Sequence, residues 1–75
     1  MSDAPTIIHQ GATVRVNYGG KSADFIWHIV EIVNDRGYEI VVYRQWNRRK
    51  QTWMYHVDSL AHFVDMIQTG KMKKA

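Results

Sequence analysis

The sequence predicts an α+β fold, in which a curled four-stranded antiparallel sheet, or a small barrel, carries one C-terminal helix packed on it. Three observations lead to this prediction. Apolar and polar residues alternate in several short segments between residues 12 and 58, as they do in half-buried strands. Glycine, asparagine and aspartate separate these segments, and one stretch near the C-terminus changes to helical periodicity. A chain of 75 residues has the size of one small domain.

The N-terminal part is expected to contain a lead-in and the first strand. Residues 1–10 are expected to be loosely held, with Pro5 as the one rigid point. Thr13–Tyr18 alternates polar and apolar residues and therefore predicts a half-buried strand. The glycine-rich segment Gly19–Ser22 then predicts a turn before the next strand.

Three further strands are expected in the middle of the chain. Phe25–Val33 and Tyr38–Trp46 are rich in β-branched and aromatic residues, which strands favour. Asn34–Gly37 between them fits a three-residue hairpin turn that ends in a left-handed glycine and adds a bulge. Asn47–Gln51 predicts a second turn, and Thr52–Val57 predicts the last strand of the sheet.

The C-terminal helix is predicted over residues 59–69. Asp58 or Ser59 is suited to cap its first turn, and Gly70 is suited to end it. Its apolar residues recur at the i, i+3, i+4, i+7 spacing of a helix that packs with one face: Leu60, Phe63, Val64 and Ile67. Residues 70–75 are expected to form a basic tail.

The predicted register divides the sheet residues between two faces. A bulged first turn pairs Asn34 with Tyr38. It also places Val30 opposite Val42, and a second turn of four or two residues then places Val42 opposite Tyr55. The face expected to form the core comprises Ile26, Val30, Ile32, Ile40, Val42, Tyr55 and Val57, with His28, Arg44, Trp46 and Trp53 toward its basic end. The opposite face comprises Trp27, Ile29, Val41, Tyr43 and Met54. Because this second face is more apolar than solvation requires, a second layer or a partner is expected to cover it.

Composition narrows the class of protein. Hydrophobic residues make up 45% of the chain and charged residues 23%, as in an ordinary globular domain. Cysteine is absent, which excludes disulfides and thiolate zinc sites. The net charge is +3, which is mildly basic. A cytoplasmic location is expected, because no apolar run has membrane-spanning length and the N-terminus lacks the features of a signal peptide.

The stretch Tyr43–Tyr55 carries the strongest functional signal, because it combines two tyrosines and two tryptophans with three arginines and a lysine. Cationic side chains bind phosphates, and flat aromatic rings stack on bases. Nucleic acid is therefore the first expected partner. The predicted nucleic-acid-binding residues are Arg44, Trp46, Arg48, Arg49, Lys50 and Trp53. The simpler alternative is a solvated turn whose two tryptophans lie in the core.

The second expected partner is a protein, because Trp, Tyr and Arg are also enriched in protein interfaces. The alternative interface, for a homodimer or for a small inhibitor of a larger protein, comprises Trp27, Ile29, Tyr43 and Met54. Met66, Met72 and the terminal lysines are expected to extend such a contact or to form a solvated tail. Exposed Trp27 and Tyr43 would favour the protein partner, and exposed Trp46 and Trp53 would favour nucleic acid.

No catalytic, metal or cofactor site is predicted, and the chain is expected not to be an enzyme. The four histidines match no zinc spacing, and the serines lie in the expected tail, loop and helix cap. Gly19–Ser22 lacks the upstream glycine of a phosphate-binding loop.

One pattern resembles small barrels of the Src-homology-3-like type, which include the Tudor, chromo and ribosomal KOW modules. The resemblance covers roughly residues 11–58 and is carried by Gly11-x-x-Val14-x-Val16, Trp27–Ile32, Tyr38-x-Ile40-x-Val42-x-Arg44 and Trp53-x-Tyr55-x-Val57. It implies binding of nucleic acid, peptides or methylated side chains rather than catalysis. The stretch Val41–Ser59 is also similar to small phage proteins without an assigned function.

Overall fold

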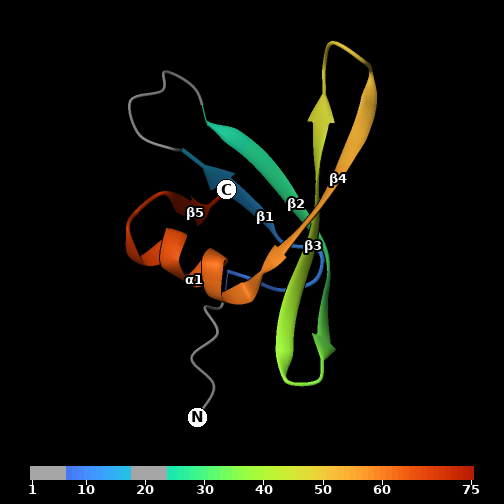
Figure 1. Cartoon of the computed structure of the whole chain (residues 1–75). Helices are drawn as coiled ribbons and strands as arrows, with labels where there is room; N and C mark the ends of the chain where they lie inside the picture. The colour runs from blue at the N-terminus through green and yellow to red at the C-terminus, as the bar shows by residue number, and fades with distance from the viewer. Residues whose placement is uncertain (1–6, 18–23) are drawn as a thin grey trace.

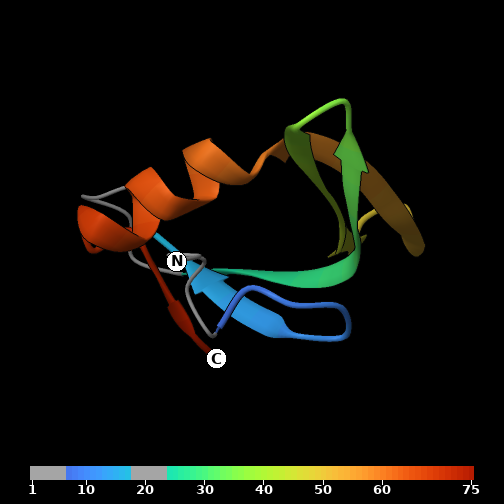
Figure 2. The ribbon, with the colours of Figure 1, turned by 90° about the horizontal axis from the view of Figure 1, so that it is seen from below.

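The computed structural model describes residues 7–17 and 24–75, and within them one helix lies against one face of a sheet (Figure 1, Figure 2). The elements in chain order are β1 (Thr13–Val16), β2 (Phe25–Asp35), β3 (Tyr38–Asn47), β4 (Thr52–Ser59), α1 (Leu60–Gln68) and β5 (Met72–Lys74). The strands lie in the order β4-β3-β2-β1-β5, and neighbouring strands are antiparallel. The predicted α+β class is therefore confirmed. In this part of the chain, no helix is long and apolar enough to cross a membrane.

The sheet differs from the prediction in strand number and in closure. It has five strands in place of the expected four, because β5 forms within residues 70–75, which were expected to be a tail. β5 pairs with β1, and β4 lies at the other edge of the sheet. The sheet is thus open, so the small-barrel alternative is not realised. Tyr18 and the turn expected at Gly19–Ser22 lie outside the described residues.

The end of α1 explains how the chain reaches the position of β5. The N–H of Gly70 donates to the carbonyl of Ile67 at 3.1 Å, and the N–H of Lys71 donates to that of Met66 at 2.8 Å. These two bonds, with a left-handed Gly70 at φ 79°, form the Schellman motif, as expected of a glycine stop. The motif reverses the chain and directs Met72–Lys74 along β1.

The first hairpin turn differs from the predicted three-residue form. Arg36 and Gly37 both have positive φ, at 56° and 88°, and Asp35 pairs directly with Tyr38. A two-residue turn of this type matches the twist of the two strands, which favours it over the wider loop. The bulge that the prediction placed in the turn is found instead within β2, between Ile29 and Glu31. Beyond it, His28 pairs with Arg44.

The core lies between α1 and the face of the sheet that carries the largest aromatic residues. The Trp27 and Tyr43 rings stack at 4.4 Å between centroids, and Phe63 of α1 lies 5.8 Å and 5.2 Å from them. The indole N–H of Trp27 donates to Gln45 Oε1 at 3.0 Å. The buried cluster comprises Ile8, Ala12, Val14, Val16, Trp27, Ile29, Val41, Tyr43, Leu60, Phe63, Met66 and Met72.

The choice of core face in the prediction was wrong. Most of the residues expected inside lie on the side away from α1, where Tyr55 is 59% exposed and Val57 is 66% exposed. The opposite face, with Trp27 and Tyr43, is the buried one. The grouping itself was largely correct, because Arg44 pairs with Tyr55 and shares its face. Both faces are apolar, so alternation defines the two sets of residues but does not indicate which set the helix covers.

Several core residues come from segments expected to be loose or solvated. Ile8 lies in the predicted lead-in and is buried. Met66 and Met72, expected in a tail or at a partner contact, are almost fully buried in the core. In the second hairpin Val42 pairs with Val57, not with Tyr55, because the four-residue loop comprises residues 48–51, one position further along the chain than the predicted pairing requires.

Candidate nucleic-acid interface

The outward face of the β3–β4 hairpin carries a compact group of aromatic and cationic side chains, called here the aromatic cluster: His28, Arg44, Trp46, Trp53 and Tyr55. The Arg44 guanidinium lies over the Trp53 ring, 4.0 Å from its centroid, and 6.0 Å from the Tyr55 ring. Arg44 Nη1 also donates to Tyr55 Oη at 3.1 Å. These contacts hold a planar cation against the aromatic rings of β4.

Two tryptophans face each other across the hairpin. Trp46 and Trp53 pair in register, with ring centroids 5.2 Å apart and planes at 70°. Trp46 is 41% exposed, whereas Trp53 is half-buried between Arg44 and Trp46. His28 meets the Trp53 ring edge-on at 5.4 Å, and its Nδ1 lies 3.2 Å from the hydroxyl of Thr13 in β1. Neighbouring strands thus fix the aromatic rings while leaving surface open for stacking.

The loop that joins β3 to β4 presents three consecutive cations, Arg48, Arg49 and Lys50, all exposed. Its backbone is fixed locally, because Asn47 Oδ1 accepts from the N–H of Lys50 at 2.9 Å. Gln51 has a left-handed φ of 54°, and its side-chain amide donates to the carbonyl of Arg48 at 2.8 Å. The loop therefore holds a concentrated positive charge in a defined turn.

No carboxylate lies in the sequence near these cations. Residues 40–57 contain neither aspartate nor glutamate, so the whole hairpin beyond Glu39 is without acidic side chains until Asp58. The ion pairs found in the described residues are elsewhere, at Arg15–Asp24 and His62–Asp58. The end of the hairpin is accordingly an uncompensated positive region, which attracts anions.

A hollow of about 560 Å³ lies at this end of the hairpin. It is lined by the three loop cations together with Gln45, Trp46, Asn47, Met54 and His56. Gln45, Met54 and His56 alternate with the aromatic cluster along the strands, so they belong to the other face of the hairpin. The cations therefore border both the aromatic surface and a concave basic surface, and phosphate oxygens can be bound at either.

The structure brings the predicted nucleic-acid-binding residues together and separates the alternative set. All six of the former lie on the β3–β4 hairpin, on its outward face or in its loop. Of the alternative protein interface, Trp27, Ile29 and Tyr43 are buried beneath α1, and only Met54 is exposed. Those three residues form core contacts and offer no surface to a partner, which corrects the expectation that they form an interface.

Two members of the aromatic cluster were not among the predicted site residues. Tyr55 was placed in the core, and His28 was noted only as a neighbour at the basic end of the same face. The signal that identifies Tyr55 is its period-two spacing from Trp53, which puts both rings on one face of β4. The sequence places His28 beside Arg44 only when the register of β2 against β3 is known, and that register requires the correct position of the bulge.

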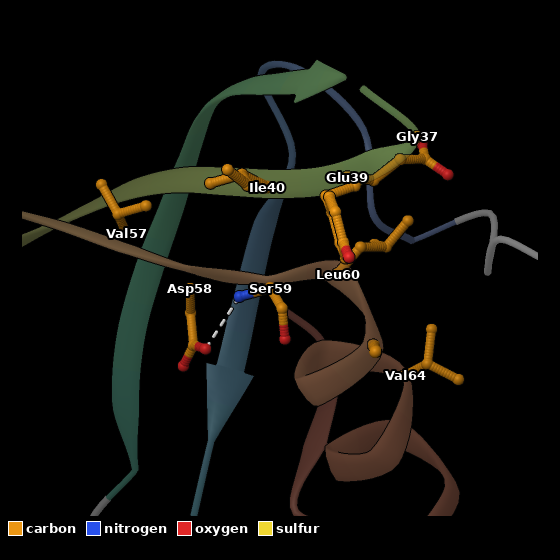
Figure 3. A pocket seen from close by; sticks show the side chains of 10 residues that line it. Gly37, Glu39, Ile40, Val57, Asp58, Ser59, Leu60 and Val64 are labelled. Carbon is orange, nitrogen blue, oxygen red and sulfur yellow. Dashed lines mark hydrogen bonds between the residues drawn. The ribbon is translucent and has the colours of Figure 1, made fainter. Parts of the chain in front are cut away.

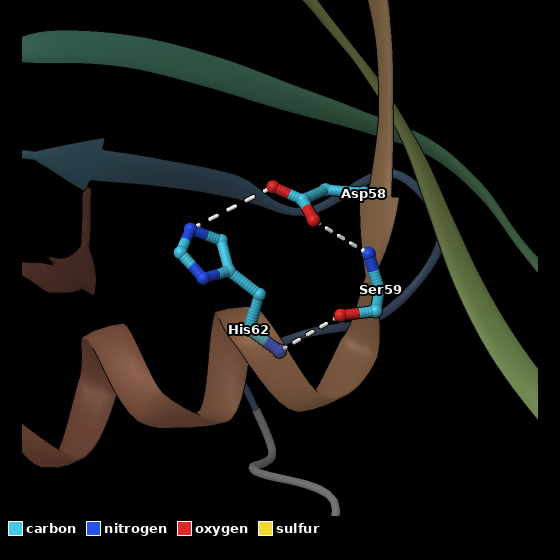
Figure 4. A network of polar contacts seen from close by, with 3 residues as sticks. All are labelled: Asp58, Ser59 and His62. Carbon is cyan, nitrogen blue, oxygen red and sulfur yellow. Dashed lines mark hydrogen bonds and ion pairs between the residues drawn. The ribbon is translucent and has the colours of Figure 1, made fainter.

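Asp58, Ser59 and His62 lie together at the start of α1, but their geometry is that of a helix cap (Figure 4). Ser59 Oγ accepts from the backbone N–H of His62 at 3.1 Å, whereas the ring Nε2 of His62 faces Asp58 at 3.6 Å. Asp58 also accepts from the N–H of Ser59 at 2.8 Å. The hydroxyl and the imidazole are engaged in separate contacts, so this group stabilises the first turn of α1.

Comparisons with known protein families, with curated proteins and with solved structures find no match to this chain. The function is therefore argued from the residues of the site and their geometry.

Proposed function

We propose that this protein binds single-stranded nucleic acid without catalysis, through the aromatic cluster and the cationic loop of the β3–β4 hairpin. The observation that carries the proposal is the Trp46–Trp53 pair, with Arg44 stacked on Trp53, immediately beside three exposed cations. Bases stack on the exposed ring surfaces, and phosphates contact Arg48, Arg49 and Lys50. The cytoplasmic location and the similarity to phage proteins remain predictions.

Single strands suit this surface better than duplexes. A sheet face can stack on bases only where these are unstacked, because the bases of a duplex already cover one another. Each stacked base contributes about 1–3 kcal/mol, and stacking tolerates any base. The proposed binding is accordingly strong for flexible strands and weakly selective for sequence.

The simpler alternative, a solvated turn with both tryptophans in the core, has less support. Trp46 is 41% exposed and contributes nothing to the buried cluster under α1. An exposed tryptophan paired with a second one is an unusual feature for a surface without a partner.

The first prediction concerns the cationic loop. The anisotropy of labelled single-stranded and double-stranded oligonucleotides is measured at increasing salt. Wild-type protein is expected to bind single strands, with a log–log salt slope of about −2, because three phosphate contacts on a single strand release about 0.7 counterion each. Alanine at Arg48, Arg49 and Lys50 together should remove this binding.

The matched control uses alanine at Lys71, Lys73 and Lys74, which removes the same number of positive charges near β5. This variant is expected to keep most of the affinity. An absence of wild-type binding at low salt would contradict the proposal. Equal losses in the two triple variants would show that net charge, not the hairpin, determines binding.

A further inference from the structure

The two edges of the sheet are built differently. β5 has only three residues, two of which are Lys73 and Lys74. Short length and lysine are the usual means by which an edge strand avoids pairing with another chain. β4 has eight residues, Thr52–Ser59, and contains no lysine, arginine or proline. Its edge is therefore a template for an added strand.

The outward side of β4 is also apolar. Tyr55 and Val57 are among the most exposed large apolar residues of the described chain. On the same face, β3 adds half-buried Val42, which pairs with Val57, and β2, one strand further from β4, adds exposed Ile26 and Val33. Exposed apolar residues beside an unprotected strand edge are typical of an interface.

The charges of the sheet are divided between its two ends. The cationic loop lies at the end of the β3–β4 hairpin, and the β2–β3 hairpin points to the opposite end of the molecule (Figure 1). Four carboxylates lie around the β2–β3 hairpin and the adjoining end of β4: Glu31, Asp35, Glu39 and Asp58. Arg36, in the turn of the β2–β3 hairpin, is the one cation among these residues. If two copies lie antiparallel along β4, the basic end of each therefore meets the acidic end of the other.

We propose that two copies of this chain pair through their β4 edges, antiparallel and about a two-fold axis near Tyr55 and His56. The pairing joins the two sheets into one continuous sheet. An axis perpendicular to the sheet leaves both aromatic clusters on the same face. This inference does not depend on the proposed nucleic-acid binding, but it would double the length of that surface.

A hollow of about 910 Å³ lies where the cationic loop of the partner would approach (Figure 3). β4 leaves the sheet after the pair Ile40–Ser59, and α1 begins immediately afterwards, so β3 continues beyond β4 toward Gly37. The hollow lies in this gap, in line with the β4 edge. Its acidic residues are Glu39 and Asp58 and its apolar ones include Ile40, Leu60 and Val64. Acidic groups beside apolar surface complement an approaching arginine-rich loop.

The second prediction concerns self-association, measured by sedimentation equilibrium of the full chain. The wild-type mass is expected to rise with concentration from 8.8 kDa toward twice that value. Val57→Lys places a lysine on the edge strand and should raise the dissociation constant about tenfold or more, because lysine on an edge strand disfavours pairing with another strand. Val57→Thr, which keeps the β-branched shape, is the control and should still dimerise.

Circular dichroism shows whether the Val57→Lys variant remains folded. A wild-type chain that stays monomeric up to millimolar concentration would overturn the proposal. A dimer that Val57→Lys does not weaken would also overturn it, because another surface would then form the contact.

Orientation is tested separately, because the chain contains no cysteine and single cysteines are therefore specific probes. His56→Cys lies near the proposed axis, where facing Cα atoms come within reach of a disulfide. Mild oxidation should join this variant into a covalent dimer. Lys73→Cys, on the β5 edge, should remain monomeric, and equal crosslinking of both variants would contradict pairing through β4.

The contribution of charge to dimerisation is tested by reversing the charge of single residues. Arg49→Glu and Glu39→Lys should each weaken dimerisation at low salt, and the two substitutions in one chain should restore it. Restoration is expected because in a two-fold dimer each reversed charge meets its reversed counterpart. A double variant weaker than either single variant would show that the two ends of the sheet do not meet.

Discussion

Arg44 is the residue on which the geometry of the candidate site depends. Its guanidinium lies over Trp53 and is hydrogen-bonded to Tyr55, so one cation orders two aromatic rings from the neighbouring strand. A guanidinium is planar and can stack on one ring while offering its other face to a base. A lysine at this position would keep the charge but lose both the stacking and the fixed geometry.

The third prediction follows from this difference. Arg44→Lys should weaken single-strand binding about two- to fivefold, which corresponds to the ~0.5–1 kcal/mol of an exposed cation–π contact. The slope of affinity against salt should not change, because the number of cations is the same. Arg15→Lys, at an exposed position on β1, is the control. Unchanged affinity would contradict stacking by Arg44 and would assign it a contact that needs only its charge, as a phosphate contact does.

At the scale of the elements, the turn between β2 and β3 shows which features of a hairpin the sequence predicts and which it does not. Asn34–Gly37 correctly predicted a hairpin turn, because asparagine, aspartate and glycine tolerate left-handed backbone. The same residues fit a two-residue and a three-residue loop equally well. The choice depends on where the strands place the bulge, at Ile29–Glu31, and that position is set by packing across the sheet.

The fourth prediction concerns this turn. Gly37 has a φ of 88°, and an added Cβ would meet nothing within 4 Å, so a substitution costs conformational energy alone. Gly37→Ala should lower the free energy of unfolding by about 1 kcal/mol. Gly37→Asn should cost less, because asparagine adopts this conformation more readily. Urea unfolding measures both, and equal stability of Gly37→Ala and wild type would contradict a left-handed glycine here.

The other elements differ in how well the sequence predicts them. The helix was predicted almost to its ends, because Ser59 and Gly70 mark its boundaries and four apolar residues mark its buried face. β5 was missed because three residues with two lysines show no alternation. It exists only because the Schellman motif at Gly70 returns the chain to β1.

At the scale of the whole molecule, the sequence did not determine which face of the sheet the helix covers. The alternation placed Arg44, Trp46, Trp53 and Tyr55 on one face correctly, but two apolar faces compete for one helix. The structure buries Trp27 and Tyr43 against Phe63 and leaves the other set outside. The consequence is functional, because the aromatic residues expected in the core become the exposed surface of the candidate site.

The fifth prediction tests this central claim most directly. The chain has three tryptophans, and each gives one indole N–H signal in a ¹H–¹⁵N correlation spectrum. Adding a short single-stranded oligonucleotide should shift the signals of Trp46 and Trp53, which lie on the proposed surface. The signal of Trp27 should move much less, because its ring is buried in the core against Phe63 of α1. Unchanged signals for Trp46 and Trp53 at saturating oligonucleotide, or a shift confined to Trp27, would contradict the proposed surface.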